Sequence, residues 1–454
     1  MFPLTMEIRH QSTPSQQPMT PVCATTLERP IRVDASPVSS LARTMQMSVT
    51  PMKCLRRGAA TILALSASFV LGLENEASAA PATPSTSPTS APSVQSTKLD
   101  KVLRRNPRSG KVTTLSGIIT ENALSGVTLD KSGKDQTINT EEVLRIEWGA
   151  FPTSFSDGKS YVARGDFENA VARFQEAAGN AAAREVIQAA ARLNSAEALL
   201  AWGAIDAGQF ANCIAECDRF LSEYADNREV PRARWLKGRA TRLSNDAAGA
   251  AAIFQGIYQE ASTERPTAGY ERSMCMLAGL DAADALLEAK QGADASTLYL
   301  AIETSLASMI AAITDLGSPE RSRLVAARGK AAAGEGFAHL AEGRLPQALT
   351  FFQGRLGSTD IATAERHAAT LGLAEVYMAQ NKIRLAQVEF AKVAAVDHTD
   401  RDRVARALLG LAQSTMQLGD SDATVSARRY LNDVKNRFGD TPSALQASAL
   451  LNTL

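Results

Sequence analysis

The chain is poor in cysteine, histidine, aromatic residues and net charge. It has five Cys and four His among 454 residues, its aromatic content is 5%, and 48 basic residues balance 48 acidic ones. Five Cys in so long a chain exclude a disulfide-stapled scaffold, because such scaffolds are short and dense in cysteine. The balanced charge argues against a general nucleic-acid binder, which carries a basic excess. The length suits several domains or one repeat array with a sizeable core.

The sequence also lacks the common signatures of catalysis. It contains no phosphate-binding G-x-x-x-x-G-K-[ST], no G-x-S-x-G and no H-E-x-x-H, and no His has a second His or a Cys at ligand spacing. Cys213 and Cys217 lie one helical turn apart, which suits a metal or redox pair or, as we favour, two small packed side chains. We therefore expect no catalytic residue, no metal and no cofactor.

The first 79 residues predict an export signal behind a disordered segment. Residues 1–51 are rich in Ser, Thr, Pro and Gln without an apolar period. In residues 52–79, a basic stretch precedes the apolar run Gly58–Leu73 and the small residues Ala77-Ser78-Ala79, which are the three parts of a secretory signal peptide. The apolar run is shorter than the roughly 20 residues of a membrane span. We expect translation to start at Met52; the alternatives are a long n-region, or an uncleaved segment that tethers the protein to the membrane.

Export would place the protein in the periplasm or outside the cell. Removal of residues 1–79 takes away seven basic and five acidic residues and leaves a net charge of −2, which gives no steering toward nucleic acid. Residues 80–100 are rich in Pro, Ser and Thr and predict a semi-extended linker. Residues 98–111 carry six basic residues, which indicates a solvated connector or, as the alternative, a contact with anionic lipid head groups.

Residues 101–150 predict a small β module. Short β-like runs alternate with turn signals, and the runs are Val112–Thr120, Gly126–Asp130, Gln136–Ile138 and Val143–Trp148. Four or five short strands in so few residues predict a strongly bent sheet or barrel that is similar to SH3-like and Sm-like barrels. RNA binding is disfavoured in an exported protein, and we expect Trp148 to be a core or interface residue.

A helical pattern begins at residue 151. Gly158 lets two helices approach closely, Tyr161 fills the space beside it, and Gly165 ends the first helix. Ala170 and Phe174, four residues apart, lie on one face of the second helix and pack back on the first. This constellation resembles the tetratricopeptide repeat (TPR).

The same pattern recurs along the chain. Two later units are defined by Gly336, Ala348 and Phe352, and by Tyr377, Ala386 and Phe390. Successive anchor residues lie 43, 37, 98, 38 and 41 residues apart, so the units are longer than the TPR period of about 34 residues. The gap of 98 residues holds two apolar-periodic helices near 267–290 and 293–316, which indicate one or two diverged pairs. Ala444–Leu451 is predicted to be a capping helix.

The resemblance implies a mostly α fold: a TPR-like α-solenoid of antiparallel helix pairs over residues 151–454, preceded by the small β module. It also implies a concave face, lined by the first helix of each pair, that binds other proteins. Matching the units places five candidate groove residues on or near that lining: Trp202, Arg232, Trp235, Arg239 and Phe337. The simpler alternative is packing between repeats for the Trp residues and solvation for the Arg residues.

We therefore expect an exported, non-enzymatic scaffold that binds envelope proteins. One rival is a carbohydrate- or peptide-active enzyme on a helical toroid, which needs carboxylates clustered in the concavity. The other rival is a functional β module for which the solenoid supports oligomerisation.

Overall fold

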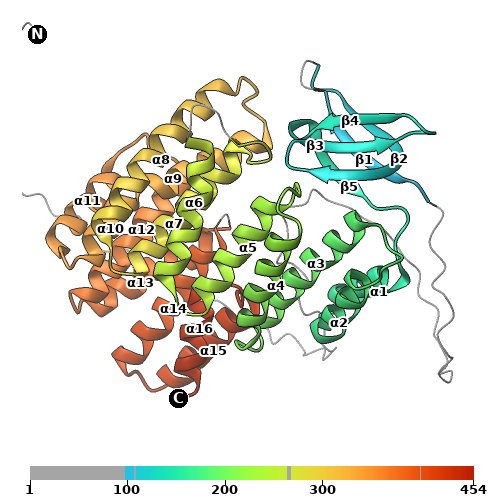
Figure 1. Ribbon diagram of the computed structural model, residues 1–454. Helices are drawn as coiled ribbons and strands as arrows, with labels where there is room; N and C mark the ends of the chain where they lie inside the picture. Colours follow the sequence, from blue (N-terminus) through green and yellow to red (C-terminus); the bar gives the residue numbers. More distant parts are fainter. Residues whose placement is uncertain (1–97, 107–108, 263–266, 399) are drawn as a thin grey trace, which may run out of the picture. The chain divides into compact units, whose positions relative to one another are not determined.

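A computed structural model describes residues 98–106, 109–262, 267–398 and 400–454 (Figure 1). All of these residues belong to one compact unit. The predicted segment 1–51, the signal peptide 52–79 and the linker as far as residue 97 lie outside the described residues.

The described chain begins with a five-stranded antiparallel sheet in the order β4-β3-β2-β1-β5. The strands are β1 (Asp100–Arg105), β2 (Val112–Ala123), β3 (Gly126–Asp130), β4 (Asp135–Asn139) and β5 (Val143–Glu147), with a 3-10 turn at Thr140–Glu142. Strands β4 and β5 are the edges, so the sheet is open and does not close into a hydrogen-bonded barrel. The four runs predicted from sequence correspond to β2 to β5.

Strand β1 corrects the interpretation of residues 98–111 as a connector. Asp100–Arg105 pairs with β2 on one side and β5 on the other, and so lies inside the sheet. The alternation of apolar and polar residues that marks a strand is not visible in its sequence. The two inward positions hold Asp100 and Val102, and only Val102 is apolar. Both side chains are fully buried, and the carboxylate of Asp100 has a partner from a distant helix.

The sheet buries one face against a helix of the solenoid. Its apolar side chains form one cluster with Val186 and Ile187 of helix α3 (Glu185–Gly203). Trp148, at the end of β5, is half-buried and packs against this cluster and against the first helical cluster. Trp148 therefore has the interface position expected from the sequence.

Sixteen α-helices follow among the described residues (Figure 1). They are α1 (Thr153–Ala163), α2 (Phe167–Ala178), α3 (Glu185–Gly203), α4 (Gln209–Glu223), α5 (Val230–Leu243), α6 (Ala247–Ser262), α7 (Arg272–Glu288), α8 (Gly292–Ala312), α9 (Pro319–Ala332), α10 (Gly334–Ala341), α11 (Leu345–Gly357), α12 (Thr363–Ala379), α13 (Ile383–Val396), α14 (Arg401–Leu418), α15 (Ala423–Arg437) and α16 (Pro442–Leu451). Successive helices pack in pairs, with α9 and α10 together forming the first helix of the pair completed by α11. The architecture is thus seven TPR-like helix pairs and a final helix.

A glycine facing a phenylalanine fixes most of these pairs. A Cβ placed on Gly158 would lie 2.7 Å from the ring of Phe174 in the paired helix, and one on Gly336 would lie 2.5 Å from Phe352. The ring of Phe352 also blocks a Cβ on Gly372, in the next pair. Because the glycine has no side chain, the ring fills the gap and is fully buried.

The other repeat-defining residues have the positions that the pattern predicts. The side chains of Ala170, Ala348, Ala386 and Phe390 are buried in the helix clusters. Tyr161 and Tyr377 are half-buried at the edges of those clusters. The recurring spacing therefore reports real helix-to-helix contacts.

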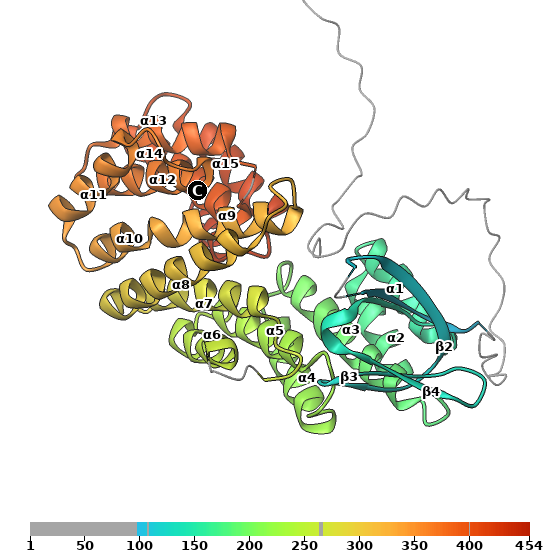
Figure 2. The same ribbon diagram turned by 90° about the horizontal axis from the view of Figure 1, so that it is seen from above.

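The first helices of successive pairs contact one another and form an inner layer. Contacts join α3 to α5, α7 to α9, α9 to α12, and α12 to α14. We call the first helices of the seven pairs, α1, α3, α5, α7, α9 with α10, α12 and α14, the inner helices, and their partners α2, α4, α6, α8, α11, α13 and α15 the outer helices. Figure 2 shows the succession of pairs from above. The last helix, α16, contacts α14 and also α5, so the end of the chain meets the third helix pair.

The gap of 98 residues contains one diverged pair, α7 with α8, followed by α9. Here Ile302 takes the place of the usual phenylalanine and lies 2.8 Å from the Cβ position of Gly279. Helix α8 is the one described helix that is long and apolar enough to cross a membrane by length and composition, with a mean hydropathy of 1.3. Tyr299, Ile302 and Leu306 of this helix are buried against neighbouring helices, and 22% of its apolar window is buried in all.

Candidate interaction surfaces

The sheet is joined to the solenoid by one buried ion pair. Asp100 of β1 is fully buried, and its two carboxylate oxygens accept hydrogen bonds from Arg184 at 2.7 and 3.0 Å. The backbone N–H groups of Ile119 and Gly149 donate to the same carboxylate at 2.8 and 2.7 Å. Arg184 also donates to the carbonyl oxygens of Ile119 and Ala150. A carboxylate with four donors is fully satisfied, so this contact pins the sheet to the start of α3.

A second contact joins the sheet to the loop between α4 and α5. Ala123 at the end of β2 forms an antiparallel bridge with Asn227, and Arg228 donates to the carbonyl oxygen of Val143 at 2.9 Å. The same guanidinium donates to the hydroxyl of Thr140. The sheet is therefore held by backbone and side-chain contacts to two successive helix pairs.

A network of charged side chains connects the inner helices. We call it the central network, and its members are Arg239, Arg242, Asp281, Asp284, Glu288, Lys330, Glu375, Asp402, Arg406 and Asp440. They come from α5, α7, α9, α12, α14 and the connection between α15 and α16. Charged groups of both signs thus converge from five inner helices.

Asp284 of α7 is the hub of this network. Lys330 of α9 lies 2.6 Å from its carboxylate, Arg242 of α5 lies 4.0 Å from it, and the hydroxyl of Tyr299 donates to it. Burial alone would raise the pKa of Asp284, but Lys330 and Arg242 together outweigh burial and leave that pKa lowered. Asp284 is therefore ionised and joins four helices, α5, α7, α8 and α9.

Two ion pairs of the network join segments that are far apart in the sequence. Arg242 of α5 lies 3.7 Å from Asp402 of α14, and it also forms a two-pronged pair with Glu288 of α7. Arg239 donates to the backbone oxygen of Asp440 at 2.9 Å, across 201 positions of the chain. The side chain of Asp440 also accepts a hydrogen bond from Arg401. These pairs connect the third helix pair with the last one.

The carboxylates of the network differ in protonation behaviour. Burial raises the pKa of Asp402 to about 6, although Arg242 opposes this change. Burial also raises the pKa of Asp281, which accepts a hydrogen bond from the indole of Trp235 at 2.9 Å. In the network, nearby cations therefore outweigh the effect of burial on the pKa of Asp284 but not on those of Asp402 and Asp281. The side chains of Asp402 and Arg406 are 36% and 40% exposed.

Three of the five candidate groove residues lie in or beside the central network. The indole of Trp235 donates a hydrogen bond to Asp281, and the guanidinium of Arg239 lies over the Trp235 ring at 5.0 Å. The third, Phe337, is buried, and Arg406 of the network lies 5.0 Å from the centre of its ring. The other two have different surroundings. Arg232 pairs with Glu197 at 2.5 Å, and Trp202 is half-buried against the first helical cluster.

The acidic half of the network was not anticipated from the sequence. Asp281 and Asp284 lie in the otherwise apolar stretch Met274–Leu287 of α7. Charged residues in so apolar a helix were a usable signal, because a buried carboxylate needs a partner. The identity of the partners Lys330 and Arg242 depends on tertiary contacts between helices.

The two neighbouring cysteines singled out by the sequence lie in the interior of the solenoid. Among the described residues, no group of three His, Cys, Asp or Glu side chains is placed to hold a metal ion. Cys213 and Cys217 are fully buried and unbridged, and the thiol of Cys213 donates to the carbonyl oxygen of Ala196. The hydrogen bond with Cys213, together with burial, raises the pKa of the Cys217 thiol. Both side chains therefore act as small packed groups.

Comparison with known proteins gives a likeness to solved repeat structures. No protein-family model and no curated protein matches the chain. A tetratricopeptide repeat protein from Parabacteroides merdae is 11% identical with a TM-score of 0.39, over 62% of this chain and 91% of that one. The apo form of RapI is 10% identical with a TM-score of 0.35, over 63% and 75%. The TPR2AB domain of yeast Sti1, solved in complex with pHSP90, is 14% identical with a TM-score of 0.22, over 65% and 95%.

Those TM-scores are too low to support any argument about function. The TPR-like architecture is established by the helix pairs, the inner layer and the glycine–phenylalanine contacts described above.

Proposed function

We propose that the protein is a non-enzymatic scaffold whose inner helices bind a partner protein through the central network. The observation that carries this proposal is the convergence of both signs of charge from five inner helices. Paired charges on a packed framework give an interface specificity, because a wrong partner leaves a desolvated charge without its counter-charge. Trp235 and Arg239, a stacked aromatic–arginine pair, are of the residue types favoured as interface anchors.

The partial exposure of the network supports a role in binding. The side chains of Glu375 and Arg406 are 23% and 40% exposed although they form an ion pair. Such pairs contribute little to stability and exchange readily with a ligand's charges. A partner with charged side chains can therefore replace internal pairs at small net cost.

The enzymatic rival requires carboxylates with a free proton or a free lone pair at the reacting atom. The network does gather carboxylates, but Asp284 and Glu375 are held by Lys330 and Arg406 at 2.6 and 2.7 Å. These contacts favour recognition over acid–base chemistry. If Asp402→Asn abolished hydrolysis of peptidoglycan or peptide substrates by the purified protein, the scaffold proposal would be abandoned.

The proposed location is the periplasm or the cell exterior, and the proposed partners are envelope proteins. The support is the three-part export signal in residues 52–79. N-terminal sequencing of the native protein tests it: a start near Ala80 is expected, and a retained segment 1–51 would contradict export.

Site-specific photo-crosslinking tests the binding surface. A benzophenone amino acid replaces Arg406 on the inner helix α14 or, as the matched control, Lys392 on the outer helix α13; both residues are cationic and both are accessible. We expect the inner position to yield an adduct with a defined protein and the outer position to yield none. Equal adducts from both positions, or none from the inner one, would contradict the proposal.

The second rival assigns function to the β module alone. The buried pair of Arg184 with Asp100 makes the sheet part of the solenoid's own core contacts, so deletion of residues 98–150 would expose apolar surface on α3. Point substitutions on the sheet's outer face separate its role from that of the solenoid without this damage.

A further inference from the structure

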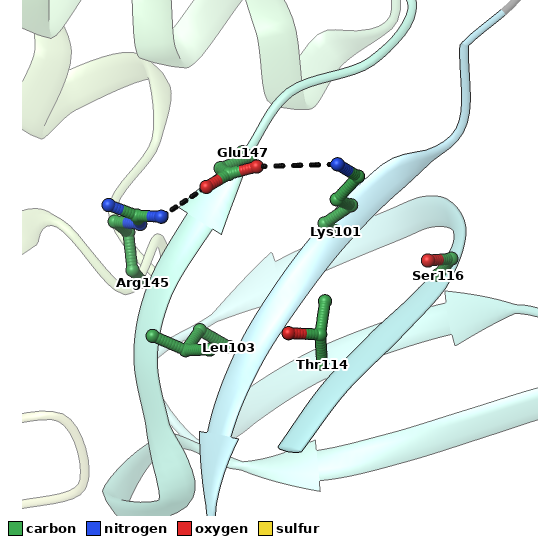
Figure 3. Close-up of a pocket in the computed structure, with 6 residues that line it drawn as sticks. All are labelled: Lys101, Leu103, Thr114, Ser116, Arg145 and Glu147. Carbon is green, nitrogen blue, oxygen red and sulfur yellow. Dashed lines mark hydrogen bonds and ion pairs between the residues drawn. The ribbon is translucent and has the colours of Figure 1, made fainter. Parts of the chain in front are cut away.

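The outer face of the sheet carries a hollow lined by side chains of three strands. In the antiparallel register, Lys101 lies opposite Ser116 and Glu147, and Leu103 lies opposite Thr114 and Arg145. Directly opposed residues project from the same face. These six side chains enclose a space of about 310 Å³ (Figure 3).

This face points away from the apolar cluster that joins the sheet to the solenoid. The inward positions of the same strands, such as Val102 and Ile146, pack in the cluster that contains Val186 and Ile187 of α3. On the outer face, the side chains of Lys101 and Glu147 are 57% and 45% exposed in the described part of the chain. This face is therefore accessible to a partner.

The charges around the hollow, on β1 and β5, are mostly positive. Lys101, Arg105 and Arg145 lie there, and Lys111 directly precedes β2. The acidic side chain at the hollow is Glu147. Asp130 and Asp135 also face outward, but they lie opposite each other on β3 and β4, away from the six residues that line the hollow.

The position of Glu147 indicates that the hollow suits a carboxylate. Its carboxylate lies between the ammonium of Lys101, at 3.8 Å, and the guanidinium of Arg145 (Figure 3). All three side chains are between 32% and 57% exposed, so solvent weakens these pairs. The hydroxyls of Thr114 and Ser116 line the same space and can donate to an oxygen anion.

We propose that this outer face binds an acidic, extended segment of a partner protein. A carboxylate of that segment displaces Glu147 from Lys101 and Arg145. The cations follow the strands, with Lys101 and Arg105 on alternate outward positions of β1, so their spacing matches side chains on one face of an extended peptide. Charge complementarity supplies the attraction, and the hollow above Leu103 supplies the space.

An anionic membrane surface fits this face less well. The exposed apolar side chains beside the hollow, Leu99 at 52% and Val112 at 47%, are aliphatic, and the residues that line the hollow include no Trp or Tyr. Interfacial membrane contacts use aromatic side chains beside the cations.

The test is fluorescence anisotropy with the full chain and a labelled (Glu-Thr)4 peptide in low salt. Lys101→Glu combined with Arg145→Glu is expected to weaken binding roughly tenfold or more, because it reverses the charge of the hollow. The matched control is Lys131→Glu combined with Lys134→Glu, which makes the same charge change in the exposed turn between β3 and β4. The control is expected to retain most of the affinity.

A substitution with the opposite sign sharpens the test. Glu147→Gln releases Lys101 and Arg145, so it is expected to tighten binding roughly two- to fivefold, as modest exposed pairs imply. Asp135→Asn makes the same charge change at the exposed start of β4 and is expected to have a smaller effect. Circular dichroism of each variant checks that it is folded.

The proposal is overturned if the two double variants weaken binding equally, or if Glu147→Gln tightens binding no more than Asp135→Asn does. It is also overturned if (Gln-Thr)4 binds as well as (Glu-Thr)4. Binding to vesicles of phosphatidylserine and phosphatidylcholine without binding to the acidic peptide would assign the face to a membrane and would likewise overturn it.

Discussion

Buried charge is satisfied differently in two regions of the described chain, the junction of the sheet with the solenoid and the central network. Where the sheet meets the solenoid, one carboxylate, that of Asp100, is fully buried and receives four hydrogen bonds, two of them from Arg184. In the central network, several carboxylates share a few cations. Lys330 and Arg242 outweigh the effect of burial on Asp284 and lower its pKa, whereas burial raises the pKa of Asp402.

This difference separates a structural contact from a recognition surface. A buried charge with all its partners in place resists change, because removal of one partner leaves an uncompensated charge. A network with partly exposed and unequally compensated members has alternative pairings that are close in energy. The first arrangement suits the fixing of a module, and the second suits an exchange of internal pairs for those of a ligand.

The largest effect is expected at the junction. Arg184→Ala leaves Asp100 buried without its cation, and we expect a loss of about 3–5 kcal/mol in the free energy of unfolding. Urea denaturation measures it. Arg184→Lys keeps the charge but loses the two-pronged geometry, so its free energy of unfolding should lie between those of the wild type and Arg184→Ala. A loss below about 1 kcal/mol for Arg184→Ala would show that the junction is not a structural pin.

A smaller effect is expected at the hub of the network. Asp284→Asn keeps the shape but removes the charge that Lys330 and Arg242 share, and we expect a loss of about 2 kcal/mol. Asp420→Asn, at an exposed position between α14 and α15, is the control and should change little. If Asp284→Asn destabilised the protein as much as Arg184→Ala, the distinction between the two regions would be lost.

The pH dependence of stability should reflect Asp402. Its pKa is raised from 3.8 to about 6 in the folded protein, so the folded state holds the proton more tightly than the unfolded state between these values. Stability therefore falls as the pH rises from about 4 to about 6. Asp402→Asn should remove this decline and, because the side chain is 36% exposed, add about 1 kcal/mol or less above pH 6.

Denaturation curves of the wild type and of Asp402→Asn at a series of pH values test this sign. If the free energy of unfolding of the wild type instead increased from pH 4 to pH 6 relative to that of Asp402→Asn, the ionised carboxylate would stabilise the fold, and the prediction would be wrong.

The smallest effect is expected for an ordinary surface pair. Arg173 and Glu176 on the outer helix α2 are 46% and 58% exposed and 2.7 Å apart. Glu176→Gln should change the free energy of unfolding by less than about 0.5 kcal/mol. This variant sets the baseline against which both buried regions are compared by the same denaturation assay.

The repeats could be predicted from the sequence because their signals are local. Gly158 and Phe174 belong to adjacent helices, and the same short spacing returns at Gly336 and Phe352. The contact between a glycine and the phenylalanine ring of the paired helix can therefore be predicted from the sequence spacing alone. The four strands β2 to β5 were also predicted, since their turns and alternation are local features.

The contacts that join distant segments could not be predicted in this way. Strand β1 was missed because Asp100 occupies an inward position, and its partner Arg184 lies 84 residues further along the chain. The pairing of Arg239 with Asp440 depends on how the inner helices succeed one another, which no short window of sequence contains. The candidate groove residues Trp235 and Arg239 were placed by matching repeat units, whereas their acidic partners required the structure.

The most direct test of the account is a comparison of partner capture by two charge reversals. Arg406→Glu changes the inner surface, and Lys392→Glu makes the same change on the outer helix α13. In quantitative pull-downs with the mature chain, we expect Lys392→Glu to retain the proteins captured by the wild type and Arg406→Glu to lose them. Retention by Arg406→Glu together with loss by Lys392→Glu would place the binding surface on the outer helices and contradict the central claim.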